Sequence, residues 1–284
     1  MKNSTVLILV GKSSNPDAIS GILGQAADLA THVSILVVDV LPPIPTYSYG
    51  IGLYGTFSVP EQWQEIVERN REELSKATDA FGALITQAKV EADIESMSAE
   101  RGALEDRISL RALSADFVVV ANDIREDKEL FEAVLQSAIF GSSAGVVLNA
   151  GDAGTCLAPK RVFVAWNYGL PVSRAVGAAL PRMCAAEEVT LAIFDPLLNQ
   201  YGDGENPGSD VARWLTHHGC SVTVKQLPAG GQEISEAIAE RATEAGADLV
   251  IMGAYDHSRM RQTLFGGTTR HMIEQTGLCV LLAH

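Results

Sequence analysis

The chain has 284 residues, 47% of them apolar and 20% charged, so it can bury a core in one large α/β domain or two ordinary ones, and global disorder is excluded. Its formal net charge of −14 argues against nucleic acid or an anionic membrane as the main partner. The apolar run from Val6 to Gly11 is too short for a signal peptide, and no run of eighteen apolar residues occurs. We therefore expect a cytoplasmic protein.

Short apolar runs alternate with helical patterns along the first half of the chain. Asn15-Pro16-Asp17 predicts the start of a helix that ends near Ala30, because proline is favoured at the first helical position. In chain order, the predicted elements are a strand at 5–11, that helix, a strand at 33–40, a helix at about 60–90, a strand near 92–99, a helix near 103–114, a strand at 116–123, a helix near 127–140 and a strand at 145–150.

The second half repeats this order. Asp39 and Asp195 fall in register when the halves are aligned, and both strands of another pair begin with aspartate, at Asp116 and Asp248. The small, polar stretch 151–160 is typical of a linker. We predict two domains, 1–150 and 160–284, in which the strands at 161–167, 188–196, 248–256 and 278–283 correspond to those at 5–11, 33–40, 116–123 and 145–150.

The strands are apolar on both faces, which is typical of parallel sheets covered by helices on both sides. The predicted fold class is therefore α/β, with two tandem Rossmann-like domains that each hold a five-stranded parallel sheet. Ligands of such sheets bind at the carboxyl ends of the strands, where the strand order reverses.

One such strand end carries glycines. Gly253 follows an apolar strand, and Gly266-Gly267-Thr268-Thr269 precedes a short helix predicted at 270–275. Amide groups at a helix N-terminus suit an anion. The alternative is that these glycines serve only the turns of the chain itself.

The segment 248–284 resembles the C-terminal signature of the universal stress protein family, which is Gly, two residues, Gly, nine residues, Gly, then Ser or Thr. The resemblance extends over both halves and is to the tandem type, with two family domains in one chain. It implies Rossmann-like domains of the adenine nucleotide alpha hydrolase-like kind, pairing of the two halves, a possible homodimer, and a stress-response role through binding rather than catalysis.

Carried over by position, Gly253 and Gly266 match the first and third glycines of the signature. Asp256 occupies the position of the second glycine of the signature, and Gly267 occupies the position of its Ser or Thr. Asn167 replaces the aspartate that holds the ribose in ATP-binding relatives. At about 6 Å from a phosphate and an effective dielectric near 20, Asp256 would cost roughly 3 kcal/mol, about a hundredfold in affinity. A magnesium ion between the charges would reverse that sign.

The expected function is therefore a non-enzymatic stress-response protein with weak or absent ATP binding. The alternative is an ATP-binding switch or slow ATPase that uses the C-terminal site. No catalytic residue, metal ligand or required cofactor is expected, ATP with magnesium being the one candidate ligand. The candidate nucleotide site comprises Asn167, Phe194, Met252, Gly253, Asp256, Gly266, Gly267 and Thr268.

In the N-terminal copy, Ala121 and Ile124 replace the first two glycines and Gly11 replaces the aspartate. The resemblance implies no nucleotide site there, and a role in pairing with the other half. For the aromatic, proline-containing stretch 41–63, we expect packing across the other half rather than a lid over a pocket.

The four cysteines include no Cys-x-x-Cys pair, so a structural zinc site is not expected. We predict isolated buried thiols at Cys156, Cys184, Cys220 and Cys279.

Overall fold

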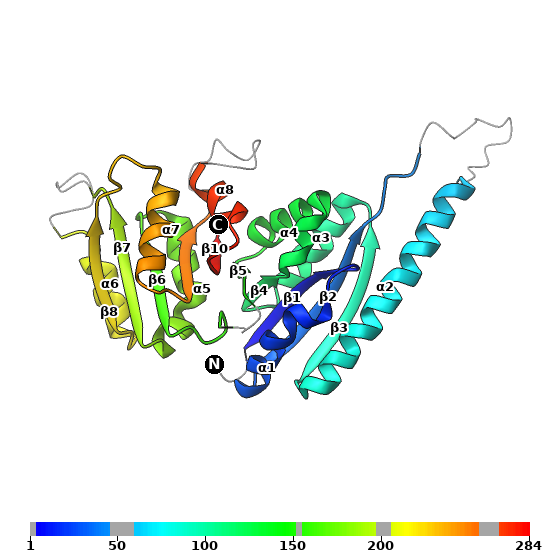
Figure 1. Ribbon diagram of the computed structural model, residues 1–284, viewed down its shortest axis with the longest axis horizontal. Helices are drawn as coiled ribbons and strands as arrows, with labels where there is room; N and C mark the ends of the chain where they lie inside the picture. Colours follow the sequence, from blue (N-terminus) through cyan, green and yellow to red (C-terminus); the bar gives the residue numbers. More distant parts are fainter. Residues whose placement is uncertain (1–3, 46–59, 152–154, 197–205, 256–266) are drawn as a thin grey trace.

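The computed structural model describes residues 4–45, 60–151, 155–196, 206–255 and 267–284. Strands and helices alternate along the first half of the chain, as predicted (Figure 1). Its elements are β1 (Thr5–Gly11), the 3₁₀ helix η1 (Pro16–Ile19), α1 (Ser20–Asp28), β2 (His32–Val40), α2 (Glu61–Ala88), β3 (Ala92–Ala99), α3 (Arg101–Ala112), β4 (Phe117–Val120), the 3₁₀ helix η3 (Asn122–Glu126), α4 (Lys128–Gly141) and β5 (Gly145–Leu148).

The second half follows the same alternation. Its elements are β6 (Arg161–Ala165), α5 (Leu170–Ala185), β7 (Glu188–Phe194), α6 (Ser209–His217), β8 (Val222–Leu227), α7 (Ile234–Glu244), β9 (Leu249–Gly253), α8 (Gly267–Glu274) and β10 (Val280–Ala283).

The predicted helix start is confirmed: helical turns begin at Pro16, first as a 3₁₀ turn, and the Asn15 side chain accepts a hydrogen bond from the Asp17 amide. Other predicted bounds were wrong. The fourth strand stops at Val120, because the chain turns into η3 and Asp123 bonds back to the loop after β1. The predicted helix at 270–275 begins earlier, at Gly267.

In the described residues, ten strands form one sheet in the order β3-β2-β1-β4-β5-β10-β9-β6-β7-β8. Within each half all the strand pairs are parallel, and the halves join where β5 and β10 pair antiparallel, with Val280 opposite Leu148. The predicted α/β fold with two sets of five parallel strands is confirmed. The domain boundaries at 150 and 160 stay a prediction.

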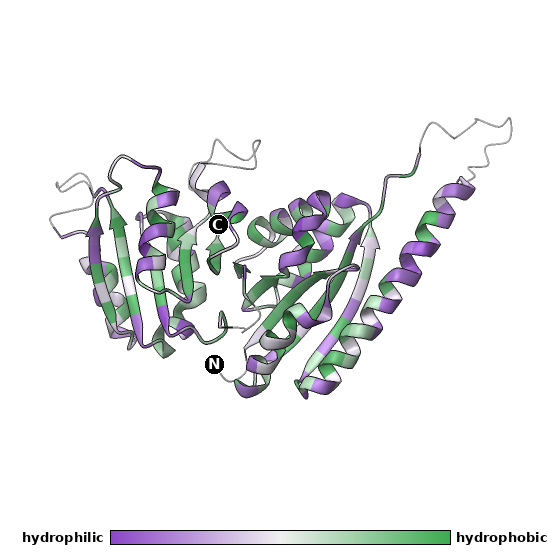
Figure 2. Cartoon of the chain, viewed as in Figure 1, coloured by the Kyte–Doolittle hydropathy of each residue, from purple (hydrophilic) through white to green (hydrophobic). Residues whose placement is uncertain are grey.

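The core lies along the central strands. Val6 to Val10 of β1 are at most 1% exposed, and Figure 2 shows the strands in the middle of each half as hydrophobic and the outer faces of the helices as hydrophilic. The edge strands β3 and β8 carry exposed polar residues, which discourages pairing with another sheet. Within the part of the chain that the structure describes, no helix is long and apolar enough to cross a membrane.

The predicted correspondence between the halves is visible in one repeated contact. The Asp116 carboxylate accepts a hydrogen bond from the Thr5 amide at 2.7 Å, and that of Asp248 accepts one from the Arg161 amide at 2.8 Å. Thr5 and Arg161 are the first residues of β1 and β6. Each aspartate thus caps the start of the neighbouring strand in its own half.

The predicted linker 151–160 is not a loose connection where the structure describes it. Cys156 and Leu157 are at most 1% exposed and belong to the hydrophobic core. The segment 46–59, which holds most of the predicted contact loop 41–63, lies outside the described residues.

Candidate functional site at the strand ends of the second half

The carboxyl ends of β6, β7 and β9 meet at one edge of the sheet. The register places Ala165 opposite both Ala192 and Met252, so Asn167, Phe194 and Gly253 come to nearly the same level. The strand order reverses between β6 and β9, which is where ligands bind to sheets of this kind. The structure therefore brings these predicted site residues to the expected edge.

Asn167 is exposed, and its side-chain oxygen accepts a hydrogen bond from the Gly169 amide at 3.1 Å. This contact shapes the turn into α5, because Gly169 is the residue before the helix. The carboxamide carries no charge with which to replace the aspartate of ATP-binding relatives.

Tyr168 was not among the predicted site residues. Its backbone lies in the left-handed region, at φ 58°, and its hydroxyl oxygen accepts from the Gly208 amide at 2.5 Å. Its ring contacts that of Trp166 edge-on, with centroids 5.8 Å apart. The sequence feature that could have indicated Tyr168 as a site residue is its aromatic side chain directly after Asn167.

Gly253 has a packing reason to be glycine. A Cβ atom there would lie 2.6 Å from the backbone nitrogen of Val172 and 2.9 Å from the Cβ of Pro171, both in the first turn of α5. The space that a side chain would take is therefore filled by the helix that follows β6. Met252, the residue before it, is 5% exposed and belongs to the core.

The first turn of α8 also reaches this edge. Thr269 is 7% exposed, and its hydroxyl accepts a hydrogen bond from the Tyr255 amide, just after β9, at 3.3 Å. The structure gives this contact to Thr269 rather than to Thr268, which is half-buried. Gly267 is exposed, and a Cβ there would meet no atom within 4 Å. Asp256 and Gly266 lie outside the described residues.

The corresponding edge of the first half is closed by a hydrogen-bond network. The Gly11 amide donates to the Ser14 hydroxyl at 2.9 Å, and that hydroxyl donates to Asp123 at 2.6 Å. The second carboxylate oxygen of Asp123 accepts from the Asn15 amide at 2.7 Å. The loops after β1 and β4 are therefore tied together.

A partly buried ion-pair cluster lies beside this network. The ammonium group of Lys12 lies 3.1 Å from Asp39 and 3.0 Å from Glu73, and Asn70 also donates to the Asp39 carboxylate. Asp39 and Asn70 are each 5% exposed. Burial alone lowers the pKa of Lys12, but its hydrogen bonds to Glu73 and Asp39 outweigh this and raise the pKa above its ordinary value. Side chains of the protein itself thus fill this end.

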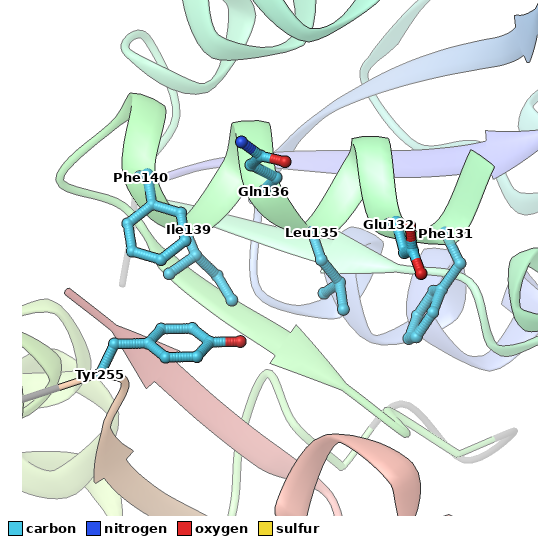
Figure 3. Close-up of a pocket in the computed structure, with 7 residues that line it drawn as sticks. All are labelled: Phe131, Glu132, Leu135, Gln136, Ile139, Phe140 and Tyr255. Carbon is cyan, nitrogen blue, oxygen red and sulfur yellow. The ribbon is translucent and has the colours of Figure 1, made fainter. Parts of the chain in front are cut away.

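The two halves meet beside the candidate site. Figure 3 shows a hollow between α4 and Tyr255, lined by Phe131, Glu132, Leu135, Gln136, Ile139 and Phe140. The Phe140 ring lies 5.1 Å from that of Tyr255 and 4.8 Å from that of His284, measured between centroids. Burial raises the pKa of Tyr255 to about 12. Tyr255 therefore packs across the junction.

Hydrogen bonds also cross this junction. Arg125 donates to the Ile273 carbonyl at 2.6 Å and to the Asn149 side chain at 2.9 Å. Asn149 in turn donates to the carbonyl groups of Gln275 and Leu278, at 2.8 and 3.0 Å. These contacts, with the β5–β10 pairing, join the halves into one sheet and fit the predicted pairing within the chain.

No protein-family model matches the sequence, and no curated protein matches it. Its fold is similar to that of a universal stress protein from Archaeoglobus fulgidus DSM 4304, with a TM-score of 0.63 and 15% identity over 98% of this chain and 95% of that one. It is also similar to a putative universal stress protein from Pseudomonas aeruginosa UCBPP-PA14, with a TM-score of 0.52 and 10% identity over 99% and 92%. Over nearly its whole length, the chain therefore has the fold of universal stress proteins.

Proposed function

We propose that this protein is a non-enzymatic universal stress protein, which acts by binding a ligand or another protein and binds ATP weakly or not at all. The observation that carries the proposal is the contact of Gly253 with the first turn of α5. A Cβ atom there would meet Pro171 and Val172, so the packing of α5 explains this glycine without a bound nucleotide.

The neighbouring position supports the same interpretation. Asn167 is uncharged and accepts a hydrogen bond from Gly169, so it offers no carboxylate like the one that holds the ribose in ATP-binding relatives. The negative charge of Asp256 would cost roughly 3 kcal/mol if a phosphate bound about 6 Å from it, at an effective dielectric near 20. In the first half, Lys12 and its two carboxylate partners fill the corresponding end.

The alternative, an ATP-binding switch or slow ATPase, has one observation in its favour. Thr269 ties the first turn of α8 to the end of β9, which places a helix N-terminus beside the strand ends. Helix N-termini attract phosphate groups through their amides and dipole. Magnesium bound with the nucleotide would neutralise the charge of Asp256.

Native mass spectrometry of the purified protein, followed by calorimetric titration with ATP and magnesium, separates the two functions. We expect no nucleotide on the purified chain and a Kd weaker than about 1 mM, which corresponds to a binding free energy of less than about 4 kcal/mol. A micromolar Kd, or hydrolysis of ATP by the pure protein, would favour the switch.

The Asp256→Gly variant tests the cause of weak binding. Removal of the charge is expected to tighten ATP binding by as much as about a hundredfold. An unchanged Kd would show that the charge of Asp256 is not the cause of weak binding. Lys128→Met is the matched control, because Lys128 is exposed on α4 and its loss should leave ATP binding unchanged.

A further inference from the structure

The prediction that the cysteines are isolated was wrong. The sulfur atoms of Cys184 and Cys220 lie 3.4 Å apart, although 36 positions separate these residues in the sequence. The Cys184 thiol also lies 3.2 Å from the His218 carbonyl oxygen, to which it donates. Two thiols in contact can be oxidised to a disulfide within the chain, which a single thiol cannot form.

Both cysteines lie where the backbone can adjust. Cys184 is in the last turn of α5, and Cys220 lies between α6 and β8. The residue before Cys220 is Gly219, which has φ 92° and open space where a Cβ atom would lie. The sulfurs must approach by little more than 1 Å to reach the disulfide bond length of about 2 Å. Such a shift is easier at the ends of elements than within them.

We propose that Cys184 and Cys220 form a redox-active dithiol, which hydrogen peroxide converts to a disulfide within the chain. The bond would tie the end of α5 to the start of β8. It would enclose β7 and α6 in the loop between the two cysteines.

The two cysteines have different roles in this reaction. Cys184 is half-buried, whereas Cys220 is 4% exposed, and burial raises the pKa of Cys220 to about 12. The thiolate of Cys184 therefore attacks the peroxide, whose O–O bond breaks to give a sulfenic acid and hydroxide. The sulfur of Cys220 then attacks the sulfenic sulfur, and the S–O bond breaks. Two thiols and one hydrogen peroxide yield one disulfide and two waters.

The other two cysteines provide a comparison within the same molecule. The Cys156 and Cys279 thiols are also hydrogen-bonded to each other, which lowers the pKa of Cys156, but the Cys156 side chain is 0% exposed. The hydrogen bond with Cys156 and burial both raise the pKa of Cys279 well above its ordinary value. Peroxide has no access to the sulfur of Cys156, and Cys279 is poorly ionised, so this pair should react more slowly than the half-buried Cys184.

Peroxide treatment of the purified chain, then alkylation and tryptic mapping without reductant, tests the proposal. The expected product is a disulfide between the peptides 183–213 and 214–225, with the loss of two hydrogen atoms, reversed by dithiothreitol. Closing this loop should raise the Tm by roughly 5–10 °C. Full alkylation of Cys184 and Cys220 after peroxide, or cross-linking of chains through Cys184, would overturn the proposal.

Variants separate the two roles. In Cys220→Ala, the sulfenic acid of Cys184 should persist and react with dimedone, whereas in Cys184→Ala no dimedone adduct should form at Cys220. Cys279→Ala is the control and should keep the disulfide between Cys184 and Cys220. Oxidation of Cys156 and Cys279 before the proposed pair would contradict the assignment, and this result can be read from the wild-type protein without any variant.

Discussion

The loops after β1 and β6 hold corresponding positions in the two halves, yet their side chains make different contacts. After β1, Lys12 reaches two carboxylates, and Ser14 and Asp123 tie the neighbouring loops together. After β6, Asn167 stays exposed and accepts a local hydrogen bond from Gly169, two positions along the chain. The repeated sheet thus places two similar sets of strand ends, and the side chains that follow them make different contacts in the two halves.

The largest effect is expected at Gly253. The Gly253→Ala change forces a Cβ to within 2.6 Å of the Val172 nitrogen, which should cost about 2–3 kcal/mol of unfolding free energy. Gly267→Ala is the matched control at the other motif glycine. Its Cβ would meet nothing, so urea unfolding should show a change within about 1 kcal/mol. Equal losses in the two variants would contradict the packing account of Gly253.

A second effect is expected at the closed end of the first half. Lys12→Met leaves the buried Asp39 without its ammonium partner, which should cost roughly 2 kcal/mol, since Lys12 is partly exposed. Lys128→Met, whose side chain is 89% exposed, should change urea unfolding by less than about 0.5 kcal/mol. A Lys12 variant as stable as the wild type would show that the ion pair does not hold this end together.

The same ion pair predicts a pH dependence. Because the pKa of Lys12 is raised in the folded state, its stabilising effect is fully present below the unfolded pKa of 10.5. It is lost as the pH rises through the folded-state value. The stability difference between wild type and Lys12→Met, measured by urea unfolding, should therefore hold from pH 7 to about 10 and shrink above that. A difference that grows with alkaline pH would have the wrong sign.

The smallest effects are expected at the two repeated aspartates. Asp116→Asn and Asp248→Asn each weaken the cap on the first strand of their half, at a cost of about 1 kcal/mol, with the larger loss for Asp248, which also accepts a hydrogen bond from the Lys160 amide at 2.9 Å. The sites do not share partners, so the double variant should lose about the sum, as thermal or urea unfolding would show. A loss in the double variant that differs strongly from this sum would mean that the two caps do not stabilise their halves independently.

The sequence predicted the sheet well, because runs such as Val6 to Val10 are apolar on both faces and leave few alternatives. Element ends were less predictable, since β4 stops at Val120 where Asp123 bonds to the loop after β1. That contact joins residues more than a hundred positions apart. The hydrophobic pattern of neighbouring residues therefore cannot predict this contact.

The candidate site was also predicted only in part. The register brought Asn167, Phe194 and Gly253 to one edge, as the strand pattern predicted. The pattern could not show that α5 packs against Gly253, that Lys12 reaches Asp39, or that Cys184 meets Cys220. Each of these depends on which loops and helices the folded chain brings together.

Backbone NMR during titration with ATP and magnesium tests most directly whether either set of strand ends binds a nucleotide. The account predicts no shift changes at Gly11 or Lys12, and weak changes near Asn167 and Gly253 that do not saturate below about 1 mM nucleotide. Saturating changes at Gly11 and Lys12 would contradict it.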